Sequence, residues 1–264
     1  VPRETVRLVG SVSNPKMIAL KSEKDWTGEY NRFAAKRSRE LAGCDLSGYV
    51  FKKDSPSCGL ERVRVYGSNG VVLRQGRGLF ANAITKQLPL MPVEEEGRLN
   101  DPTLRENFIE RVFAYRRWQD FSAEAKSIGA LVQFHTSHKF LLLAHSERHY
   151  RQLGRVVAAA TRGQIREQYD EYGCTFMIAL SVHATPKKHT NVLDHMMGYF
   201  SKQLSPAERQ ELIDVISDYH AHLIPLIVPI TLIRHYAKKY SVTYLQGQFY
   251  LEPSPKELML RNHV

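Results

Sequence analysis

The sequence contains no long apolar run, and this absence bears on membrane insertion. Its most apolar stretch, residues 223–233, has eleven residues and includes two prolines, whereas a membrane-spanning helix needs roughly 20 apolar residues. The first thirty residues mix Arg, Glu, Lys and Asp and contain no continuous apolar segment, so they do not have the pattern of a secretory signal. The sequence therefore predicts a cytoplasmic protein without a transmembrane helix.

Cysteine is scarce. The three cysteines, Cys44, Cys58 and Cys174, are an odd number and lie far apart in the sequence, which argues against a disulfide framework and for a reducing compartment. We expect Cys44 and Cys174 to be small buried core residues. Cys58 stands between Ser57 and Gly59, in a proline-containing loop after an expected strand, so its thiol should be accessible. It is a candidate nucleophile or metal ligand, and the residues around it leave both roles open.

Acidic residues are too few to balance the basic ones. The 37 Lys and Arg residues exceed the 27 Asp and Glu residues, which gives a formal net charge of +10. This surplus favours a polyanionic partner, although charge alone does not separate nucleic acid from an anionic membrane. Hydrophobic residues make up 43% of the chain, enough to build a core, so the composition excludes a disordered protein.

Histidine is absent from residues 1–118, and all eleven histidines lie in residues 119–264, so the sequence divides into two unlike modules with these bounds. The first module alternates short apolar runs with turn signals, which is typical of an α/β fold. Its expected elements are strands at residues 48–53, 62–66 and 71–73, a tight turn at residues 68–70, and helices near residues 30–41 and 78–87.

The second module has helical periodicity nearly throughout and is predicted to be an all-α bundle. Asp101-Pro102 is expected to begin the helix that leads into it, because a capping side chain is followed there by proline in the first turn. Thr185-Pro186 has the same form, and Ser205 with Glu208 makes a capping box. Residues 130–160 are periodic along their length.

Four histidines in this periodic stretch, His135, His138, His145 and His149, fall near one helical face. On a continuous helix His138 and His145 would lie about 10 Å apart, so one metal ion cannot bind all four. No cysteine or carboxylate completes a zinc spacing with any pair of them. Hydrogen bonds between helices, or contacts from a groove to an anionic ligand, are the other interpretations.

Lys187, Lys188 and His189 fill the first turn of the helix that Thr185-Pro186 begins. The positive end of a helix dipole repels cations at this position. A phosphate bound by the free backbone N–H groups and these side chains would remove the conflict. The alternative is a basic turn that faces only solvent.

Three motifs of the first module resemble the carboxyl-terminal two thirds of the thiouracil desulfidase family (DUF523). They are Lys53-Asp-Ser-Pro-Ser-Cys-Gly59, Gly76-Arg-Gly-Leu-Phe80 and the opening Pro2-Arg-Glu4. The second module resembles the helical domain found fused to that family (DUF1722) through residues 134–146 and 255–264. The whole chain is thus similar to the desulfidases that remove sulfur from 4-thiouridine in tRNA.

This resemblance implies a [4Fe–4S] cluster bound by three cysteines, in which one iron has no protein ligand. Such an iron can take the sulfur of a thiocarbonyl while water attacks the carbon, a hydrolysis without electron transfer. Cys58 is the one cluster ligand that the resemblance places in this chain. The other two belong to motifs upstream of Pro2-Arg-Glu4, so the resemblance predicts a truncated amino terminus: the chain as it stands is expected to be inactive, and a longer form active.

The leading function is therefore desulfuration of 4-thiouridine in tRNA, with the base leaving its stack to reach the cluster. Ser55 is expected to offer a hydroxyl to the base or to the departing sulfur. Lys53 would stabilise negative charge, unless it only faces solvent, and Glu4 would accept a proton from the attacking water. The expected phosphate contacts are Arg62, Arg64, Lys139, Lys187, Lys188 and His189.

Two other functions remain open. One is desulfuration of free thiouracil or a thionucleotide, with the helical module serving dimerisation or regulation. The other is a nucleic-acid-binding protein without catalysis, in which Cys58 is structural.

Overall fold

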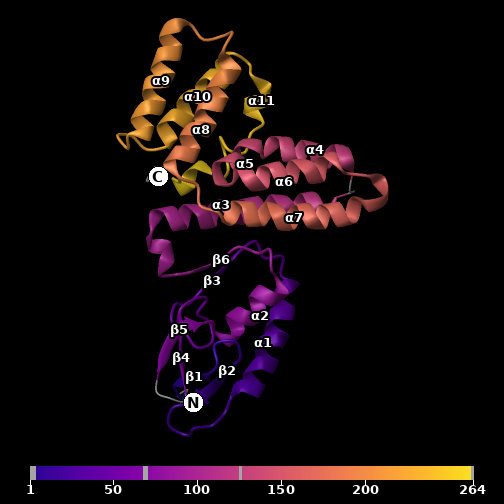
Figure 1. Ribbon diagram of the computed structural model, residues 1–264, viewed down its shortest axis with the longest axis vertical. Helices are drawn as coiled ribbons and strands as arrows, with labels where there is room; N and C mark the ends of the chain where they lie inside the picture. The colour runs from indigo at the N-terminus through magenta and orange to yellow at the C-terminus, as the bar shows by residue number, and fades with distance from the viewer. Residues whose placement is uncertain (1–3, 68–70, 125–126, 263–264) are drawn as a thin grey trace. The chain divides into compact units, whose positions relative to one another are not determined.

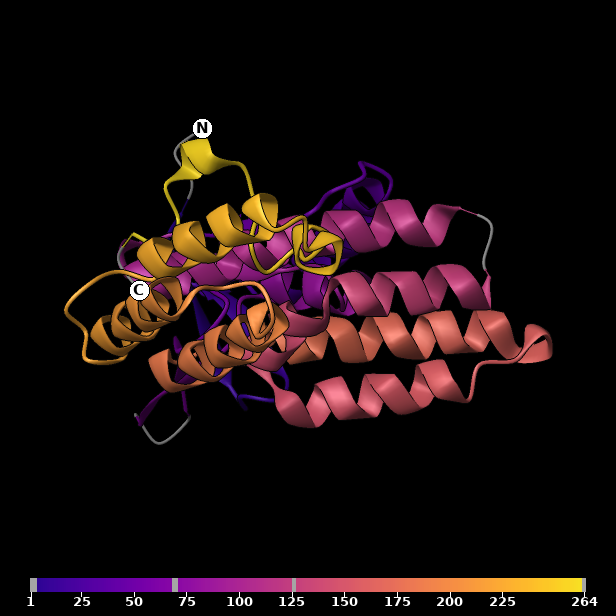
Figure 2. The same ribbon diagram turned by 90° about the horizontal axis from the view of Figure 1, so that it is seen from above.

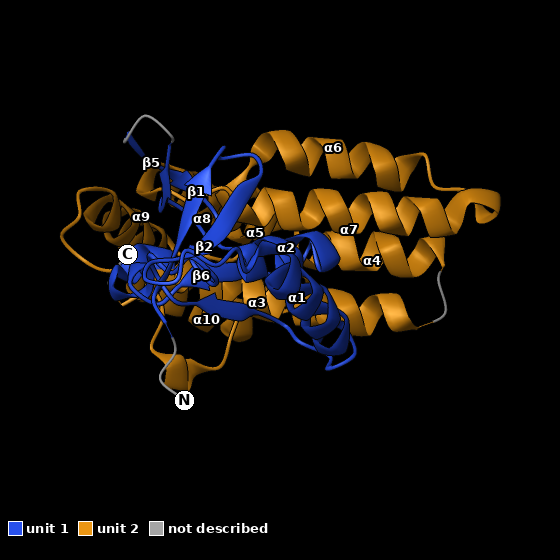
Figure 3. Cartoon of the chain, turned by 90° about the horizontal axis from the view of Figure 1, so that it is seen from below, with its two compact units in different colours: residues 1–104 blue, residues 105–264 orange. Residues whose placement is uncertain are grey.

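The chain divides between Leu104 and Arg105 into two units, residues 1–104 and 105–264 (Figure 3). The computed structural model describes residues 4–67, 71–124 and 127–262. The sequence analysis put the boundary at Trp118, but that indole is only 6% exposed and stacks on Tyr172 in the core of the second unit. The boundary falls earlier because nearly all of the helix that begins at Pro102 belongs to this core.

The first unit contains two small sheets and two longer helices, which confirms the predicted α/β class (Figure 1). The larger sheet has the order β2-β1-β4-β5, with β1 parallel to β4 and the outer pairs antiparallel. The smaller sheet pairs β3 with β6 in parallel. The elements are β1 (Val6–Gly10), β2 (Pro15–Ala19), α1 (Thr27–Ala42), β3 (Tyr49–Phe51), β4 (Val63–Tyr66), β5 (Val72–Gly76), α2 (Leu79–Gln87), β6 (Val93–Glu95) and the 3-10 turn η1 (Arg98–Asn100).

Alternation of side chains along β4 explains how the larger sheet is built. Val63 and Val65 are buried, and Arg64 between them is exposed, because successive residues of a strand face opposite sides of the sheet. The two valines pack with Leu8 of β1 and Met17 of β2. The predicted hairpin is confirmed by the β4–β5 pairing. Its expected turn, residues 68–70, lies outside the described residues.

The second unit is helical, as predicted. A group of helices that includes α3, α4, α6 and α7 is followed along the chain by a second group that includes α8, α9 and α10 (Figures 1 and 2). Its longer helices are α3 (Pro102–Ala123), α4 (Ile128–Ser137), α5 (Lys139–His145), α6 (Glu147–Ala158), α7 (Ile165–Ser181), α8 (Pro186–Met197), α9 (Pro206–His220) and α10 (Ile227–Lys239). The short elements are η2 (Arg162–Gln164), η3 (Gly198–Phe200), α11 (Thr243–Gln246) and η4 (Lys256–Leu258). Within residues 4–67, 71–124 and 127–262, no helix is both long enough and apolar enough to cross a membrane.

The predicted helix starts agree with the structure. The Asp101 carboxylate accepts the Leu104 N–H at 3.0 Å beside the first turn of α3. Thr185 caps α8, and Ser205 with Glu208 forms the complete capping box of α9. These agreements follow because a cap depends on residues within one turn of the helix end.

The periodic stretch at residues 130–160 is three helices rather than one. The chain turns at His138, between α4 and α5, and at Ser146, whose hydroxyl caps α6. The expectation that four histidines share one helical face is therefore wrong. Among the residues that the structure describes, no three His, Cys, Asp or Glu side chains are grouped so that they could bind a metal ion.

Candidate functional site

The loop that carries Cys58 connects β3 to β4 and is marked at both ends by strained backbone. Asp54 and Arg62 have φ angles of 55° and 56°, in the left-handed region that residues with a side chain rarely adopt. Such conformations persist only where surrounding contacts enforce them. We call residues 53–62 the Cys58 loop.

Hydroxyl groups support Cys58 from within this loop. The Ser55 Oγ atom accepts the backbone N–H of Ser57 at 3.3 Å and that of Cys58 at 3.2 Å. The Ser57 Oγ atom lies 3.0 Å from the Ser55 Oγ atom and 3.3 Å from the Cys58 Sγ atom. Ser55 therefore shapes the turn on which Cys58 stands, and Ser57 is the hydroxyl in contact with the thiol.

The backbone of the loop meets the amino-terminal end of α2. The Ser57 carbonyl accepts the N–H groups of Phe80, at 2.9 Å, and Ala81, at 3.2 Å, and the Gly59 carbonyl accepts that of Gly78 at 2.8 Å. These bonds satisfy helix N–H groups that have no partner within the helix. A Cβ atom on Gly78 would lie 2.3 Å from the Ser57 carbonyl oxygen, so only glycine allows this approach. The Gly76-Arg-Gly-Leu-Phe80 motif thus packs against the Cys58 loop and is hydrogen-bonded to it.

Two neighbouring carboxylates accept backbone N–H groups near the two ends of the loop. Glu95 of β6 accepts the backbone N–H groups of Leu60, at 2.8 Å, and Glu61, at 3.2 Å. Glu96 accepts the N–H of Lys53 at 2.7 Å. The sequence analysis did not identify these glutamates as part of the site. The sequence signal was the run Glu94-Glu95-Glu96, which directly follows the apolar residues 88–93.

Aromatic side chains lie next to the loop. Tyr49 contacts Phe51 and Phe80, with ring centroids 4.6 Å and 6.2 Å away, and Phe33 of α1 continues the group to the surface, where it is 55% exposed. Burial, and after it the nearby Cys58 thiolate charge, raises the pKa of Tyr49. The Tyr49 phenol therefore keeps its proton at neutral pH and can donate a hydrogen bond beside Cys58.

Of the other candidate catalytic residues, Lys53 lies at the edge of the loop and Glu4 is engaged elsewhere. The Lys53 side chain is exposed, and its stem passes beside Gly97. The Glu4 carboxylate accepts the N–H groups of Lys21 and Ser22, both at 2.6 Å, and the Ser22 hydroxyl. These bonds, led by those from Ser22, lower the pKa of Glu4. In this structure Glu4 stabilises the turn after β2, which corrects the expected role as a proton acceptor near Cys58.

The two cysteines expected in the core are both exposed. Cys44 follows the carboxyl end of α1, and its thiol donates to the Glu40 carbonyl at 3.3 Å. Cys174 is on the outer side of α7, because its neighbour Gly173 faces inward against Trp118. The prediction for Cys174 assigned the wrong face of the helix, because a shift of one residue rotates a side chain by about 100° around the helix axis.

Arg62 and Arg64, two of the expected phosphate contacts, are exposed, and so is Lys187. Lys139 is partly engaged: its ammonium donates to the Tyr199 hydroxyl at 3.3 Å and lies 5.9 Å from the Tyr244 ring centroid. Cation–π contacts of this kind compete with a phosphate for the ammonium.

Lys188 and His189 point into the second unit, which corrects the expectation that they contact phosphate. The Lys188 ammonium donates to the carbonyls of His145, at 2.6 Å, and His183, at 3.1 Å. Burial lowers the pKa of His189 to about 3, and its Nδ1 atom lies 2.9 Å from the Tyr250 hydroxyl. His189 is therefore neutral at pH 7, and Lys187 alone retains the expected role.

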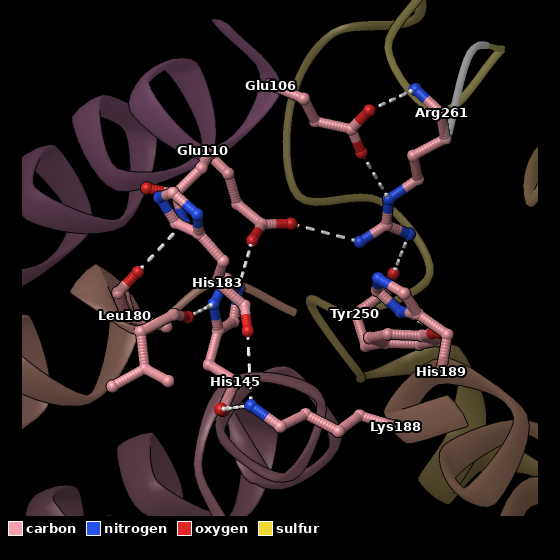
Figure 4. A network of polar contacts seen from close by, with 11 residues as sticks. Glu106, Glu110, His145, Leu180, His183, Lys188, His189, Tyr250 and Arg261 are labelled. Carbon is pink, nitrogen blue, oxygen red and sulfur yellow. Dashed lines mark hydrogen bonds and ion pairs between the residues drawn. The ribbon is translucent and has the colours of Figure 1, made fainter. Parts of the chain in front are cut away.

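A buried network of charges lies beside them (Figure 4). The His145 Nε2 atom is 2.5 Å from one Glu110 oxygen, and its Nδ1 atom is 2.6 Å from the Val182 carbonyl. The other Glu110 oxygen accepts from Arg261 at 3.0 Å, and the Arg261 N–H donates to Glu106 at 2.9 Å. Both ring nitrogens of His145 face oxygen acceptors, so the geometry fits an imidazolium paired with a carboxylate.

The network is closed to substrates. Glu110, His145 and Arg261 are 5%, 2% and 4% exposed. Burial acts to raise the pKa of Glu110, but the charge and hydrogen bond of His145 and the charge of Arg261 outweigh it and lower this pKa to about 2. We conclude that the network ties α3 and α5 to the carboxyl-terminal segment.

Glu106 gives the network a pH dependence that can be measured. Burial, opposed by Arg261 and assisted by Glu110, raises the pKa of Glu106 to about 7 from 4.5. Because the folded state binds this proton more tightly than the unfolded chain, the Glu106 contribution to stability is full below pH 4.5 and is lost as the pH rises to about 7. The loss should be about 3 kcal/mol.

The variant Glu106→Gln removes this titration. The free energy of unfolding of the unmodified protein should fall by this amount as the pH rises from 4.5 to 8, whereas that of the variant should not. The difference between the two proteins should therefore change by about 3 kcal/mol in favour of the variant. Urea unfolding at both pH values measures this difference, and effects common to both proteins cancel. A difference that does not change with pH would contradict the raised pKa.

Comparisons with known proteins match two parts of the chain to two different families. Residues 1–96 match the family described as 2-thiouracil desulfurase. Residues 139–255 match the family described as protein of unknown function (DUF1722). No solved structure matches the chain.

A curated relative extends the comparison. The chain is 36% identical over 166 residues to the uncharacterized protein YbgA of Escherichia coli (strain K12), and the match covers 62% of this chain and 95% of YbgA. The chain therefore belongs to the same family as YbgA, with a 2-thiouracil desulfurase region at residues 1–96 and a DUF1722 region at residues 139–255.

Proposed function

We propose that the protein removes sulfur from a thiolated uracil base and that its substrate is 4-thiouridine in cytoplasmic tRNA. The observation that carries the proposal is the Cys58 loop, which is held by Glu95 and Glu96 beside an aromatic surface. The match of residues 1–96 to the 2-thiouracil desulfurase family supports the reaction class.

The surroundings of the loop suit a nucleobase. Exposed aromatic rings stack on bases of any sequence, a contact worth roughly 1–3 kcal/mol per base. Phe33 provides such a ring, and the protonated Tyr49 hydroxyl provides a donor for an oxygen or sulfur of the base. The Cys58 Sγ atom lies 3.3 Å from the Ser57 hydroxyl, and its charge contributes to the raised pKa of Tyr49.

The net charge and the exposed arginines support an RNA substrate. Each phosphate that a cationic side chain neutralises releases counterions and adds affinity. Arg62, at the end of the Cys58 loop, and Arg64, on β4, are exposed and are the phosphate contacts we propose in the first unit. Lys187 and the partly engaged Lys139 are those we propose in the second unit.

We also propose Cys58 as one ligand of the [4Fe–4S] cluster that the family resemblance implies. The residues described do not make up a three-thiolate site: no three His, Cys, Asp or Glu side chains among them could hold a metal ion, and Cys44 and Cys174 are exposed. We therefore derive no step through the cluster.

The net reaction is a hydrolysis. A thiocarbonyl and water give a carbonyl and hydrogen sulfide, so the C=S bond is replaced by C=O and no electron transfer is needed. In the proposed site, Phe33 and Tyr49 bind and orient the base. Ser55 and the two glutamates hold the loop in place.

Free 2-thiouracil is the second candidate substrate. The family description itself names this base, and the inward orientation of Lys188 and His189 removes two of the phosphate contacts expected for RNA. A free base needs only the first unit and a small pocket.

An assay of both substrates tests the proposal. The longer form that the family resemblance predicts is reconstituted anaerobically with iron and sulfide and given tRNA that contains 4-thiouridine, or free 2-thiouracil. We expect sulfide release with a kcat/KM at least tenfold higher for the tRNA, and a strong dependence of this value on salt. A higher kcat/KM for the free base would support the second candidate. Binding of tRNA without sulfide release would instead support a non-catalytic nucleic-acid-binding protein.

A further inference from the structure

A cavity of about 550 Å³ lies in the second unit, between α10 and the carboxyl-terminal segment at residues 251–262. This volume is within the range of small-molecule sites, which is roughly 300–1,000 Å³. No step of the proposed desulfuration uses it.

One face of α10 forms a wall of the cavity. Ile227, Thr231, Arg234 and Lys238 all line it, and their spacing places them on the same side of a helix. Lys256, from the opposite segment, also lines it. About half of the remaining lining residues are apolar, and these include Leu251, Pro253 and Leu260. The cavity thus combines an apolar surface with a basic wall.

Two of its cations have no internal counter-charge. Arg234 is paired with Glu252, and Arg261 with Glu110. Lys238 and Lys256 are exposed and make no side-chain hydrogen bond or ion pair within the described parts of the chain. An occupant with about two negative charges would balance the site.

The network of Figure 4 fixes the wall opposite α10. The Arg261 carbonyl accepts the Ile227 N–H at 3.1 Å, its N–H donates to Glu106, and its guanidinium donates to the Tyr250 carbonyl and to Glu110. These contacts hold the segment in place beside α10, and a wall that is held in place reduces the entropic cost of binding.

We propose that this cavity binds the phosphate monoester of a nucleotide, with Lys238 and Lys256 contacting the phosphate and the aliphatic residues contacting the nucleoside. A phosphate monoester carries about −1.5 to −2 charges at pH 7, which matches the two free ammonium groups. The nucleotide is either free or the 5′ end of an RNA.

Binding of UMP to the whole protein, followed by isothermal titration calorimetry, tests the proposal. The double variant Lys238→Glu/Lys256→Glu should raise the Kd by about tenfold or more, because both charge-assisted contacts are reversed. The control is Lys202→Glu, which makes the same substitution at one exposed position outside the cavity and should leave the Kd within about twofold. Far-UV circular dichroism checks that all variants are folded.

Three results would overturn the proposal: no binding of UMP at millimolar concentration, equal binding of uridine and UMP, or equal loss with the control variant. A 5′-phosphorylated oligouridine distinguishes the sources. Tighter binding of this oligomer than of its 5′-hydroxyl form and of UMP indicates an RNA end, and tighter binding of UMP indicates a free nucleotide. The probe has no thiocarbonyl, so these results are independent of desulfuration.

Discussion

In the longer form that the family resemblance predicts, replacing Cys58 by serine is expected to abolish desulfuration, with a loss of at least about a thousandfold in kcat/KM, equivalent to about 4 kcal/mol. The expectation follows from position: Cys58 is the cysteine in the loop that Glu95 and Glu96 hold, with its Sγ atom 3.3 Å from the Ser57 hydroxyl. Sulfide release from thiolated tRNA and the iron content of the reconstituted protein are measured together. If Cys58 is a cluster ligand, both should fall.

The chain supplies a matched control in Cys44→Ser. Cys44 lies in the same unit, but it is exposed and its thiol donates to the Glu40 carbonyl of α1, so the same chemical change should leave both measurements unaltered. Full turnover in Cys58→Ser would refute the assigned site. Equal losses in both variants would show a general dependence on thiols rather than a role of this loop.

The variant Glu110→Gln should destabilise the protein by about 3–5 kcal/mol, because removing one partner of a buried ion pair leaves the other charges uncompensated. Here His145 and Arg261 both lose the carboxylate that faces them. Urea unfolding at pH 7 measures the change in the free energy of unfolding.

Glu167→Gln is the control for this variant. Glu167 is exposed in the first turn of α7, and the same substitution there should change stability by no more than about 0.5 kcal/mol. A loss below about 1 kcal/mol for Glu110→Gln would mean that the network in Figure 4 contributes little to folding.

The sequence predicted the Cys58 loop, but it did not predict the glutamates that hold the loop in place. Pro56 and Gly59 predicted a loop after a strand, and the structure has β3 ending at Phe51 just before it. Glu95 is 35 residues from Leu60, the residue whose N–H it accepts, and no local pattern connects them. The parallel pairing of β3 with β6 brings these parts together.

The histidines show the opposite case, in which a local pattern misled. Apolar spacing continues through residues 130–160, yet the backbone turns at His138 and Ser146. Both turns are stabilised by side-chain contacts: the His138 Nδ1 atom lies 2.8 Å from the Phe134 carbonyl, and Ser146 caps the helix that follows. Periodicity does not register such breaks, because the new helix restarts with a similar apolar face.

The sequence by itself determined the two modules, their α/β and all-α classes, the capped helix starts and the Cys58 loop, because each depends on composition or on residues a few positions apart. Tertiary structure decided which charges are buried. Glu110 and Arg261 are 151 residues apart and are paired in the core, and Lys188 turns its ammonium toward backbone carbonyls. The loss of hydration of a buried charge is offset only when distant chain segments supply its partners. Packing, rather than sequence spacing, places those partners beside the charge.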